Sequence, residues 1–282
     1  MAEKPFGIEN TGSRFSSRIS ARFAELGRQE KKGLVVYLMA GDPSLEATGI
    51  ILQEVVRAGA DFIELGVPFS DPLADGPVIQ RAAERALRAG ATLRKVLTLL
   101  PSWRDGVQAP VILFTYYNPI LQYGIEAFAR DARQAGADGV LAVDLTPEEA
   151  DVYLRALREQ RLDAIFLGSP TSSDERLRLA ASASSGFLYV VSRTGVTGER
   201  EELAQTLAPL VRRARQVTSL PLAVGFGISN PQQVQVVQRL ADAAVVGSAV
   251  VHAVEERYPS GGAGEIGNFV RWLKQNPGSE AA

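Results

Sequence analysis

The feature that most limits how this chain can fold is the regular alternation of short apolar runs with longer amphipathic segments. Eight runs rich in Val, Ile, Leu and aromatic residues recur along the sequence. They are LVVYLMA (34–40), FIELGV (62–67), PVILFTY (110–116), GVLAVD (139–144), DAIFLGSP (163–170), GFLYVVS (186–192), LAVGFGI (222–228) and AAVVGSA (243–249). Nearly continuous apolar runs of this length are typical of parallel strands that are buried on both faces.

The segments between the runs carry the start and stop signals of helices. Asp42-Pro43 indicates an N-cap followed by proline at the first helical position. Three segments have the spacing of capping boxes or close variants, namely TPEE (146–149), SSDE (172–175) and NPQQ (230–233). The sequences RAGAD (57–61) and QAGAD (134–138) each place a glycine at the end of a helix, directly before a run. They form a weak internal repeat that joins a helix to the next strand.

Eight strands that alternate with helices over roughly 250 residues favour a single (β/α)8 TIM barrel. The alternative is an open doubly wound sheet, but no GxGxxG phosphate turn follows the first run. Before that run, the segment 16–28 places Ile19, Phe23 and Leu26 on one helical face. This spacing predicts an extra N-terminal helix that covers one end of the barrel.

The composition is that of a soluble globular protein, with 282 residues of which 46% are hydrophobic and 22% charged. No Pro/Ser-rich linker divides the chain, so we expect a flexible N-terminus (1–15), one TIM-barrel domain (16–275) and a flexible tail (276–282). The net charge of −2 gives no basic field for nucleic acid or an anionic membrane. No run approaches the ~20 apolar residues that span a bilayer, and the N-terminus lacks the apolar stretch of a secretory signal. We therefore expect a cytoplasmic protein that binds neither nucleic acid nor membrane.

The residue types that are absent or rare limit the chemistry. The chain has no cysteine and a single histidine, His252, so we expect no disulfide, no thiolate nucleophile and no metal site. None of the lysines lies at the end of an apolar run, where a Schiff-base lysine would be expected. Catalysis is therefore expected from carboxylates, hydroxyls and backbone amides.

Two acids stand where a barrel carries its function, at the C-terminal ends of the strands. Glu64 lies inside the second run and Asp75 in the loop that follows it. A buried glutamate is rare without a partner or a task, which favours a functional Glu64 over one paired with an arginine or held by backbone donors. Asp75 could equally be the cap of the helix that begins at DGPVIQ (75–80). Asp71 is typical of a turn.

Glycine clusters follow the last three runs. They are SRTGVTG (192–198), GFGIS (225–229) and GSA (247–249). Glycine lets backbone N–H groups approach an anion, and a helix that starts there adds its positive end, so the clusters favour a phosphate site over simple tight turns. The segment 248–258 can supply this helix, with Ser248 at its start. His252, one turn later, is predicted to be a surface residue.

Together these motifs closely resemble the alpha chain family of tryptophan synthase. The resemblance extends from about Arg18 to Trp272 and rests on IELGVPFSDPLADGP (63–77), followed in order by SRTGVTG, AVGFGIS (223–229) and VVGSA (245–249). It implies a TIM barrel that cleaves indole-3-glycerol phosphate into indole and D-glyceraldehyde 3-phosphate. One small departure is Thr146 in DLTPEEA (144–150), where a second proline is commoner; this position concerns the beta-chain interface.

The resemblance also implies the roles of single residues. The catalytic glutamate and aspartate of the family fall on Glu64 and Asp75, its tyrosine beside the glutamate on Tyr189, and its loop threonine that contacts the aspartate on Thr197. The positions of the phosphate-binding backbone are Gly198, Gly227, Gly247 and Ser248, and those that line the indole pocket are Tyr37, Tyr116 and Phe226.

The implied reaction is a retro-aldol cleavage, which suits a chain with no lysine or metal site for the task. Our hypothesis is that Glu64 protonates the indole C3 and assists removal of the hydroxyl proton. Asp75 would stabilise the indole N–H as positive charge develops there. A glutamate that does this in an apolar barrel mouth should have a raised pKa.

The resemblance further implies a partner. The family's alpha chain works in an α2β2 heterotetramer with a PLP-dependent beta chain that receives the indole, so this chain is expected to hold no cofactor. The loops 68–76 and 193–198 are expected to close over the substrate. Alternatives are a stand-alone lyase that releases free indole, a non-catalytic allosteric barrel, which would have lost Glu64 or Asp75, and another phosphate-binding barrel such as an isomerase or a thiamin phosphate synthase relative.

Overall fold

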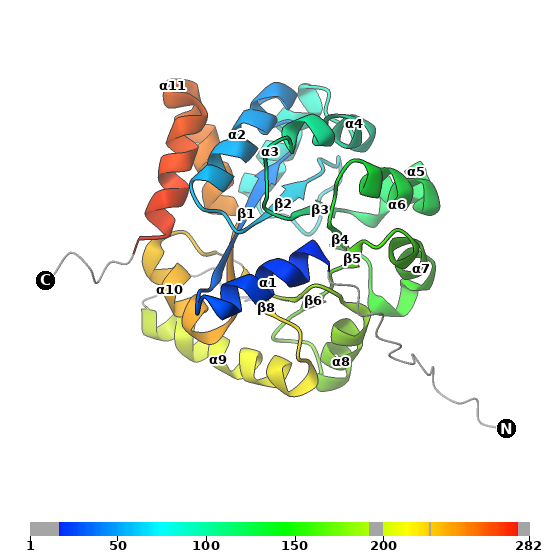
Figure 1. The fold of residues 1–282 in the computed structure, drawn as a ribbon, viewed down its shortest axis with the longest axis vertical. Coiled ribbons are helices and arrows are strands. Elements are labelled where there is room, and N and C mark those ends of the chain that lie inside the picture. Colours follow the sequence, from blue (N-terminus) through cyan, green and yellow to red (C-terminus); the bar gives the residue numbers. More distant parts are fainter. Residues whose placement is uncertain (1–16, 192–199, 226, 276–282) are drawn as a thin grey trace, which may run out of the picture.

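The computed structural model describes residues 17–191, 200–225 and 227–275. The expected flexible ends, 1–15 and 276–282, lie outside these residues, and the assignment of 16–275 to one domain stays a prediction. The described residues form one parallel sheet with helices around it (Figure 1).

The sheet follows the predicted runs closely. Its strands are β1 (Gly33–Met39), β2 (Phe62–Gly66), β3 (Val111–Thr115), β4 (Gly139–Ala142), β5 (Asp163–Ala164), β6 (Leu167–Gly168), β7 (Leu188–Val191), β8 (Leu222–Gly225) and β9 (Ala243–Val246). Their spatial order is β5-β4-β3-β2-β1-β9-β8-β7-β6, and every neighbouring pair is parallel.

The fifth run supplies both ends of this order, which closes the sheet into a barrel. β5 pairs with β4 and β6 pairs with β7, and only Ile165 and Phe166 separate the two short strands. The Ile165 N–H donates to the Val140 carbonyl on one side (3.0 Å), and the Phe166 carbonyl accepts from the Tyr189 N–H on the other (3.2 Å). The predicted eight strands therefore appear as nine because the fifth run is divided, and the predicted (β/α)8 barrel is confirmed.

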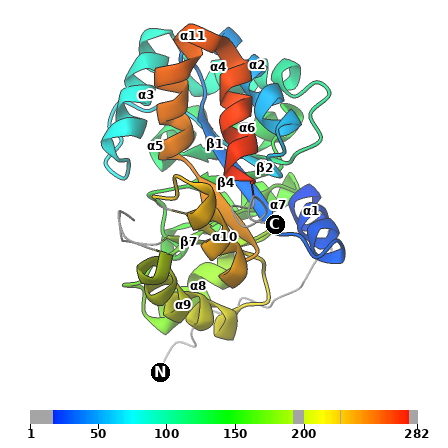
Figure 2. The same ribbon diagram turned by 90° about the vertical axis from the view of Figure 1, so that its left-hand side faces the viewer.

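Helices form a ring around the strands (Figures 1 and 2). They are α1 (Arg18–Arg28), α2 (Leu45–Arg57), α3 (Pro77–Arg88), α4 (Leu93–Trp103), α5 (Tyr117–Tyr123), α6 (Ile125–Gln134), the 3-10 turn η1 (Pro147–Glu149), α7 (Asp151–Glu159), α8 (Asp174–Ala183), α9 (Arg200–Val217), α10 (Pro231–Leu240) and α11 (Ser248–Leu273). Gly262 interrupts α11 with a φ of +63°, and Figure 2 shows the chain turning back there. Among the helices of the described residues, none combines the length and apolar character that a membrane crossing requires.

Three of the six helix ends predicted from capping and stop signals are correct, and three are not. Gly59 (φ +105°) and Gly136 (φ +92°) end α2 and α6 as the repeat predicts, and the Asn230 side chain caps α10 by accepting from the Gln233 N–H. The N-cap at Asp42-Pro43 is wrong, because the Asp42 carboxylate pairs with an arginine of another helix. Ser44 caps α2 in its place. The caps predicted from two further segments also differ: Ser173 rather than Ser172 caps α8, and Thr146 precedes η1 without a side-chain cap bond.

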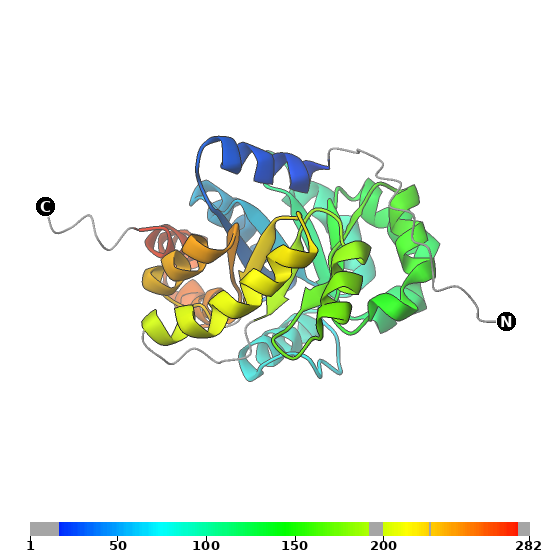
Figure 3. The same ribbon diagram turned by 90° about the horizontal axis from the view of Figure 1, so that it is seen from below.

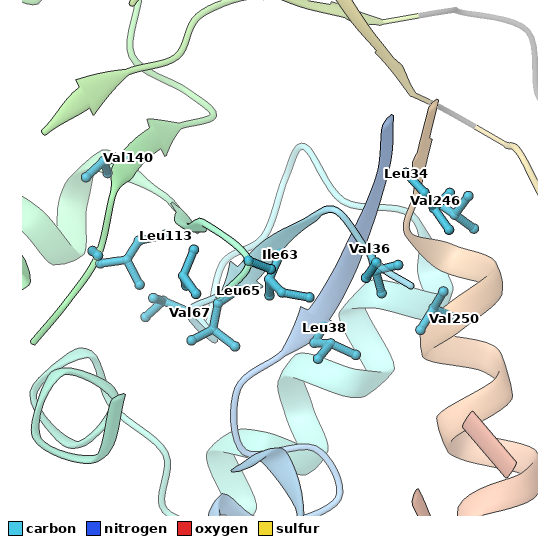
Figure 4. Close-up of a cluster of buried hydrophobic side chains, with 14 of the residues drawn as sticks. Leu34, Val36, Leu38, Ile63, Leu65, Val67, Leu113, Val140, Val246 and Val250 are labelled. Carbon is cyan, nitrogen blue, oxygen red and sulfur yellow. The ribbon is translucent and has the colours of Figure 1, made fainter. Parts of the chain in front are cut away.

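The continuous apolar runs are explained by two cores on opposite faces of the strands. Alternate residues of each strand face outward and pack against the ring of helices, as the labelled side chains of Figure 4 show. The other residues face into the barrel, where Phe62 and Phe187 meet Phe23 of α1 at ring-centroid distances of 4.4 Å and 5.8 Å. The helix α1 buries Ile19, Phe23 and Leu26 across the end of the barrel, which confirms the predicted extra helix (Figures 1 and 3).

Two buried aspartates, Asp61 and Asp138, and the half-buried Asp242 stabilise the end of the barrel that α1 covers. Asp61 and Asp138 are the last residues of the two repeat sequences, and Asp242 precedes β9. Each aspartate stands just before one strand, and its carboxylate accepts a hydrogen bond from a backbone N–H at the start of the preceding strand in the sequence. The bonds are Leu34 N–H to Asp61 (2.9 Å), Val111 N–H to Asp138 (2.9 Å) and Leu222 N–H to Asp242 (2.9 Å). The repeat therefore encodes a bond between strands as well as a helix stop, and the sequence analysis missed this.

Candidate active site

Glu64 lies on the interior face of β2, in an otherwise apolar layer of the barrel. Its neighbour in the register of β1 is Tyr37, and the interior position before it on β2 is Phe62. The side chain is 1% exposed, and within residues 17–191, 200–225 and 227–275 its Oε1 has no hydrogen-bond partner. Burial raises the pKa of Glu64 to about 8, because no solvent stabilises the ionised form. Glu64 therefore keeps its proton at neutral pH, and the alternative of a satisfied structural glutamate does not hold for the described residues.

Asp75 lies in the loop between β2 and α3, and it is not a helix cap. The N-cap of α3 is Gly76, which has no side chain to bond, and Pro77 begins the helix. The Asp75 carboxylate instead accepts a hydrogen bond from the Tyr116 hydroxyl (3.1 Å). Burial raises the pKa of Asp75 to about 6, although the bond from Tyr116 acts in the opposite direction. Asp75 is therefore largely ionised at neutral pH, whereas Glu64 is not.

Tyr116, at the end of β3, fixes the loop that carries Asp75. Its hydroxyl accepts a hydrogen bond from the Ala74 N–H (2.9 Å) while it donates to Asp75. The Gln80 side chain, in the first turn of α3, donates to the Asp75 carbonyl (2.9 Å). The ring of Phe69 lies 5.2 Å from that of Tyr116. The resemblance places Tyr116 in the indole pocket; the structure adds its contact with the acid.

Two tyrosines occupy the same layer of the barrel as Glu64. A Cβ atom on Gly66 would collide with the Tyr37 hydroxyl, and one on Gly225 would collide with the Tyr189 hydroxyl. Glycine is thus required at both positions by the close approach of a phenol. Burial raises the pKa of both tyrosines well above the ordinary value, and the nearby Glu64 raises it further. Both phenols therefore stay protonated and can donate hydrogen bonds.

A wall of half-buried apolar side chains packs against the interior core nearer the C-terminal ends of the strands, and no sequence motif indicated it. Its members are Phe114, Val143, Leu167 and Val191, one from each of four strands or strand ends. Each lies on the interior face two positions after a buried residue of the same segment, but its own side chain is only partly buried. The sequence cannot show that these four residues are less buried, because their burial depends on which end of each strand α1 covers.

The start of α11 is one of the two described parts of the predicted phosphate site; the other is Gly227. Gly247 ends the β9 segment and is the N-cap residue, and Ser248 is the first residue of the helix. The Gly247 carbonyl accepts from the N–H groups of Val250 (2.9 Å) and Val251 (3.1 Å), which leaves the first amides of the helix for other partners. Gly247 lies beside Tyr37, since a Cβ on it would be 3.6 Å from the tyrosine Cβ.

The other predicted residues are placed as follows. Gly227 follows β8 with a φ of +75°, which favours glycine. His252 has a side chain that is 58% exposed and lies 3.7 Å from Glu255, as expected for a surface residue. Thr197, Gly198 and Phe226 lie outside the described residues, together with the loop 193–198.

Sequence comparison decides the family. Residues 23–269 match the family model of the tryptophan synthase alpha chain. The chain belongs to the tryptophan synthase alpha chain family. It is 48% identical over 266 residues to the alpha chain of Solibacter usitatus, covering 94% of this chain and 100% of the relative. It is 52% identical over 258 residues to that of Geotalea uraniireducens, covering 92% and 97%.

Solved structures of the family have the same fold. The tryptophan synthase subunit alpha of Legionella pneumophila superposes with a TM-score of 0.85 at 39% identity, over 92% of this chain and 97% of that one. A chain of the aminoacrylate-bound tryptophan synthase of M. tuberculosis superposes with a TM-score of 0.82 at 36% identity, over 92% and 98%.

Family membership makes the chain a lyase of the tryptophan synthase type. Its reaction is the alpha half-reaction, cleavage of indole-3-glycerol phosphate into indole and D-glyceraldehyde 3-phosphate in tryptophan biosynthesis. The alternatives of an isomerase, a thiamin phosphate synthase relative and an open doubly wound sheet are therefore wrong.

Proposed function

We propose that Glu64 and Asp75 are the two catalytic acids of the cleavage, with the roles set by their different pKa values. The protonated Glu64 donates its proton to the indole C3, and the resulting carboxylate takes the proton of the adjacent side-chain hydroxyl. The C–C bond then breaks, its electrons return to the ring, indole leaves, and the hydroxyl carbon becomes the aldehyde. Glu64 ends the cycle protonated, so one residue serves as acid and base.

The ionised Asp75 stabilises the ring nitrogen while C3 carries the extra proton. Protonation at C3 places positive charge on the indole N–H, and a fixed carboxylate in a partly buried site stabilises that charge more than water does. The hydrogen bonds from Tyr116 to Asp75 and from the Ala74 N–H to Tyr116 support this assignment, because they hold the carboxylate in place before the reaction. Asp75 pairs with Tyr116 rather than with a cation among the described residues, so its charge remains available to the substrate.

We assign the substrate contacts to the residues around this pair. The start of α11, at Gly247 and Ser248, would bind the phosphate with Gly227 and with Gly198, because free N–H groups and the helix dipole favour an anion there. Tyr37 and Tyr189 would donate hydrogen bonds near Glu64. The wall formed by Phe114, Val143, Leu167 and Val191 would contact the indole ring, together with Phe226. Thr197 is proposed to meet Asp75 when the loops 68–76 and 193–198 close.

We further propose that the chain acts with a tryptophan synthase beta chain in an α2β2 heterotetramer in the cytoplasm. The beta chain would hold the PLP and receive the indole, and this chain would hold no cofactor. Leu73, in the loop that carries Asp75, is 95% exposed, and we propose that it contacts the beta chain. The other candidate is a stand-alone lyase, which would have full activity without a partner.

The experiment is an assay of indole released from indole-3-glycerol phosphate, with and without a matched beta chain. We expect slow release by the chain alone and a large increase on addition of the beta chain. Equal rates would favour the stand-alone lyase. Glu64→Gln should abolish release in both conditions, and Asp75→Asn should lower kcat more than it changes KM. Substantial activity in Glu64→Gln would show that the catalytic assignment is wrong.

A further inference from the structure

Four charged side chains connect α3 with α11 and with the loop after β1; we call this cluster, Asp42, Arg81, Arg85 and Glu255, the α3–α11 bridge. The Arg85 guanidinium donates to both carboxylate oxygens of Asp42 (2.7 Å and 2.9 Å) and to Oε1 of Glu255 (2.7 Å). Arg81 donates to both oxygens of Glu255 (3.2 Å and 3.0 Å). The two arginines and two acids balance in charge, and Arg85 contacts both acids.

The α3–α11 bridge lies between the two parts of the proposed active site. Helix α3 begins at Pro77, directly after the loop with Asp75, and α11 begins at Ser248, where the phosphate would bind. Glu255 lies about two turns beyond Ser248, and Asp42 follows the strand that carries Tyr37. Arg85 therefore ties together three elements that hold different parts of the substrate.

The bridge is partly buried, and its contacts favour the charged forms of Glu255 and Arg85. The side chains of Asp42, Arg85 and Glu255 are 3%, 27% and 25% exposed. Hydrogen bonds from Arg81, with the charges of both arginines, lower the pKa of Glu255 to about 2, and Asp42 raises the pKa of Arg85. Bidentate arginine–carboxylate contacts also fix orientation as well as distance. The bridge thus links α3, α11 and the loop after β1 in a defined geometry.

We propose that Arg85 is a positioning residue for the cleavage: it sets the distance and angle between Asp75 and the phosphate-binding start of α11. The substrate spans this distance, with its phosphate at one end and the indole N–H at the other. A displacement of about 1 Å between such groups can cost on the order of 100-fold in rate. The proposal rests on the proposed roles of Asp75 and of the start of α11.

The test compares Arg85→Gln with a matched control, Arg22→Gln. Arg22 also contacts two acids, Asp61 and Glu25, and has a similarly exposed side chain of 31%, but it lies on α1 at the opposite end of the barrel. Both variants should lose a comparable amount of stability in thermal unfolding. At a temperature well below both midpoints, Arg85→Gln should lose about 10-fold or more in kcat/KM for indole-3-glycerol phosphate, and Arg22→Gln should keep the activity of the unsubstituted chain. Equal kinetics in the two variants would overturn the proposal.

Two further variants test the proposal independently of whether Arg85→Gln folds. Arg85→Lys retains the charge but cannot bind both acids with the same geometry, so a smaller loss of kcat/KM is expected even if Arg85→Gln does not fold. Glu255→Gln weakens only the link to α11. It should raise the inhibition constant of inorganic phosphate several-fold, whereas an unchanged constant would contradict the link.

The same assays distinguish this inference from the proposed function. If Asp75→Asn keeps full activity, the proposed function itself is wrong. If Asp75→Asn is impaired while Arg85→Gln and Arg85→Lys match Arg22→Gln, only the role of Arg85 is refuted.

Discussion

Replacing Glu64 by glutamine should stabilise the folded protein while it removes the activity. The ordinary pKa of the glutamate is 4.5, and burial raises that of Glu64 to about 8. At pH 7 the unfolded chain ionises this carboxyl, whereas the folded chain keeps the proton. At about 1.4 kcal/mol for each pH unit, this difference lowers the free energy of unfolding by about 3 kcal/mol. Glutamine is uncharged in both states and lacks this penalty, so Glu64→Gln should be more stable by about that amount.

The pH dependence separates this effect from ordinary changes in packing. Below pH 4.5 both states hold the proton, so the advantage of Glu64→Gln should vanish. The advantage should grow as the pH rises and level off near pH 8, at about 5 kcal/mol. Urea unfolding of the two proteins at a series of pH values measures it directly, with Glu84→Gln on the exposed surface of α3 as the control. A difference in stability that does not change between pH 4.5 and pH 8 would refute the reasoning.

Three further outcomes are expected. The acid limb of the pH–rate profile should reflect the pKa of Asp75, about 6, because the ionised carboxylate is the active form. Tyr116→Phe removes the hydrogen bond that lowers this pKa, so it should move the acid limb to higher pH by up to about one unit and lower kcat. Gly66→Ala should lower kcat sharply, measured as indole release, because the new Cβ displaces the Tyr37 hydroxyl. Asp138→Ala should lower the free energy of unfolding by about 3–5 kcal/mol in urea titration, since it removes one partner of a buried ion pair, with little change in kcat.

Each of these outcomes has a control or a contradicting result. Gly264→Ala introduces a methyl group with no atom nearby, so it should leave kcat unchanged. An acid limb that stays in place in Tyr116→Phe would show that the bond to Asp75 does not set its pKa. A large fall of kcat in folded Asp138→Ala would contradict the separation of the two ends of the barrel.

The sequence predicted the fold well because the barrel buries both faces of its strands. Leu34, Val36 and Leu38 face the helices while Val35 and Tyr37 face the interior, so the whole run had to be apolar. Glu64 stood out for the same reason, since an acid is exceptional in such a run. In the structure the Oε1 atom of Glu64 has no hydrogen-bond partner among the described residues, which argues against a purely structural glutamate and supports the proposed chemical role.

The helix cap predicted at Asp42-Pro43 is wrong, and the cap considered for Asp75 as an alternative to a catalytic role is excluded. Both outcomes depend on contacts between distant segments. Asp42-Pro43 has the local pattern of a helix start, but Arg85 takes the carboxylate and the helix begins after Ser44. Asp75 has the local pattern of a cap, but the Tyr116 hydroxyl binds it. In both cases a side chain far along the chain offers a better partner than the nearby backbone, which no local motif can show.

The divided fifth strand gives the barrel a seam. β5 and β6 each align only two residues with their neighbours, whereas β1 and β2 align five. Because fewer residues are paired there, local opening of the sheet costs less free energy at the seam than between the longer strands. Leu167 belongs to this seam and faces the proposed indole pocket, so a weakly paired stretch of the barrel borders the place where the indole ring would enter and leave.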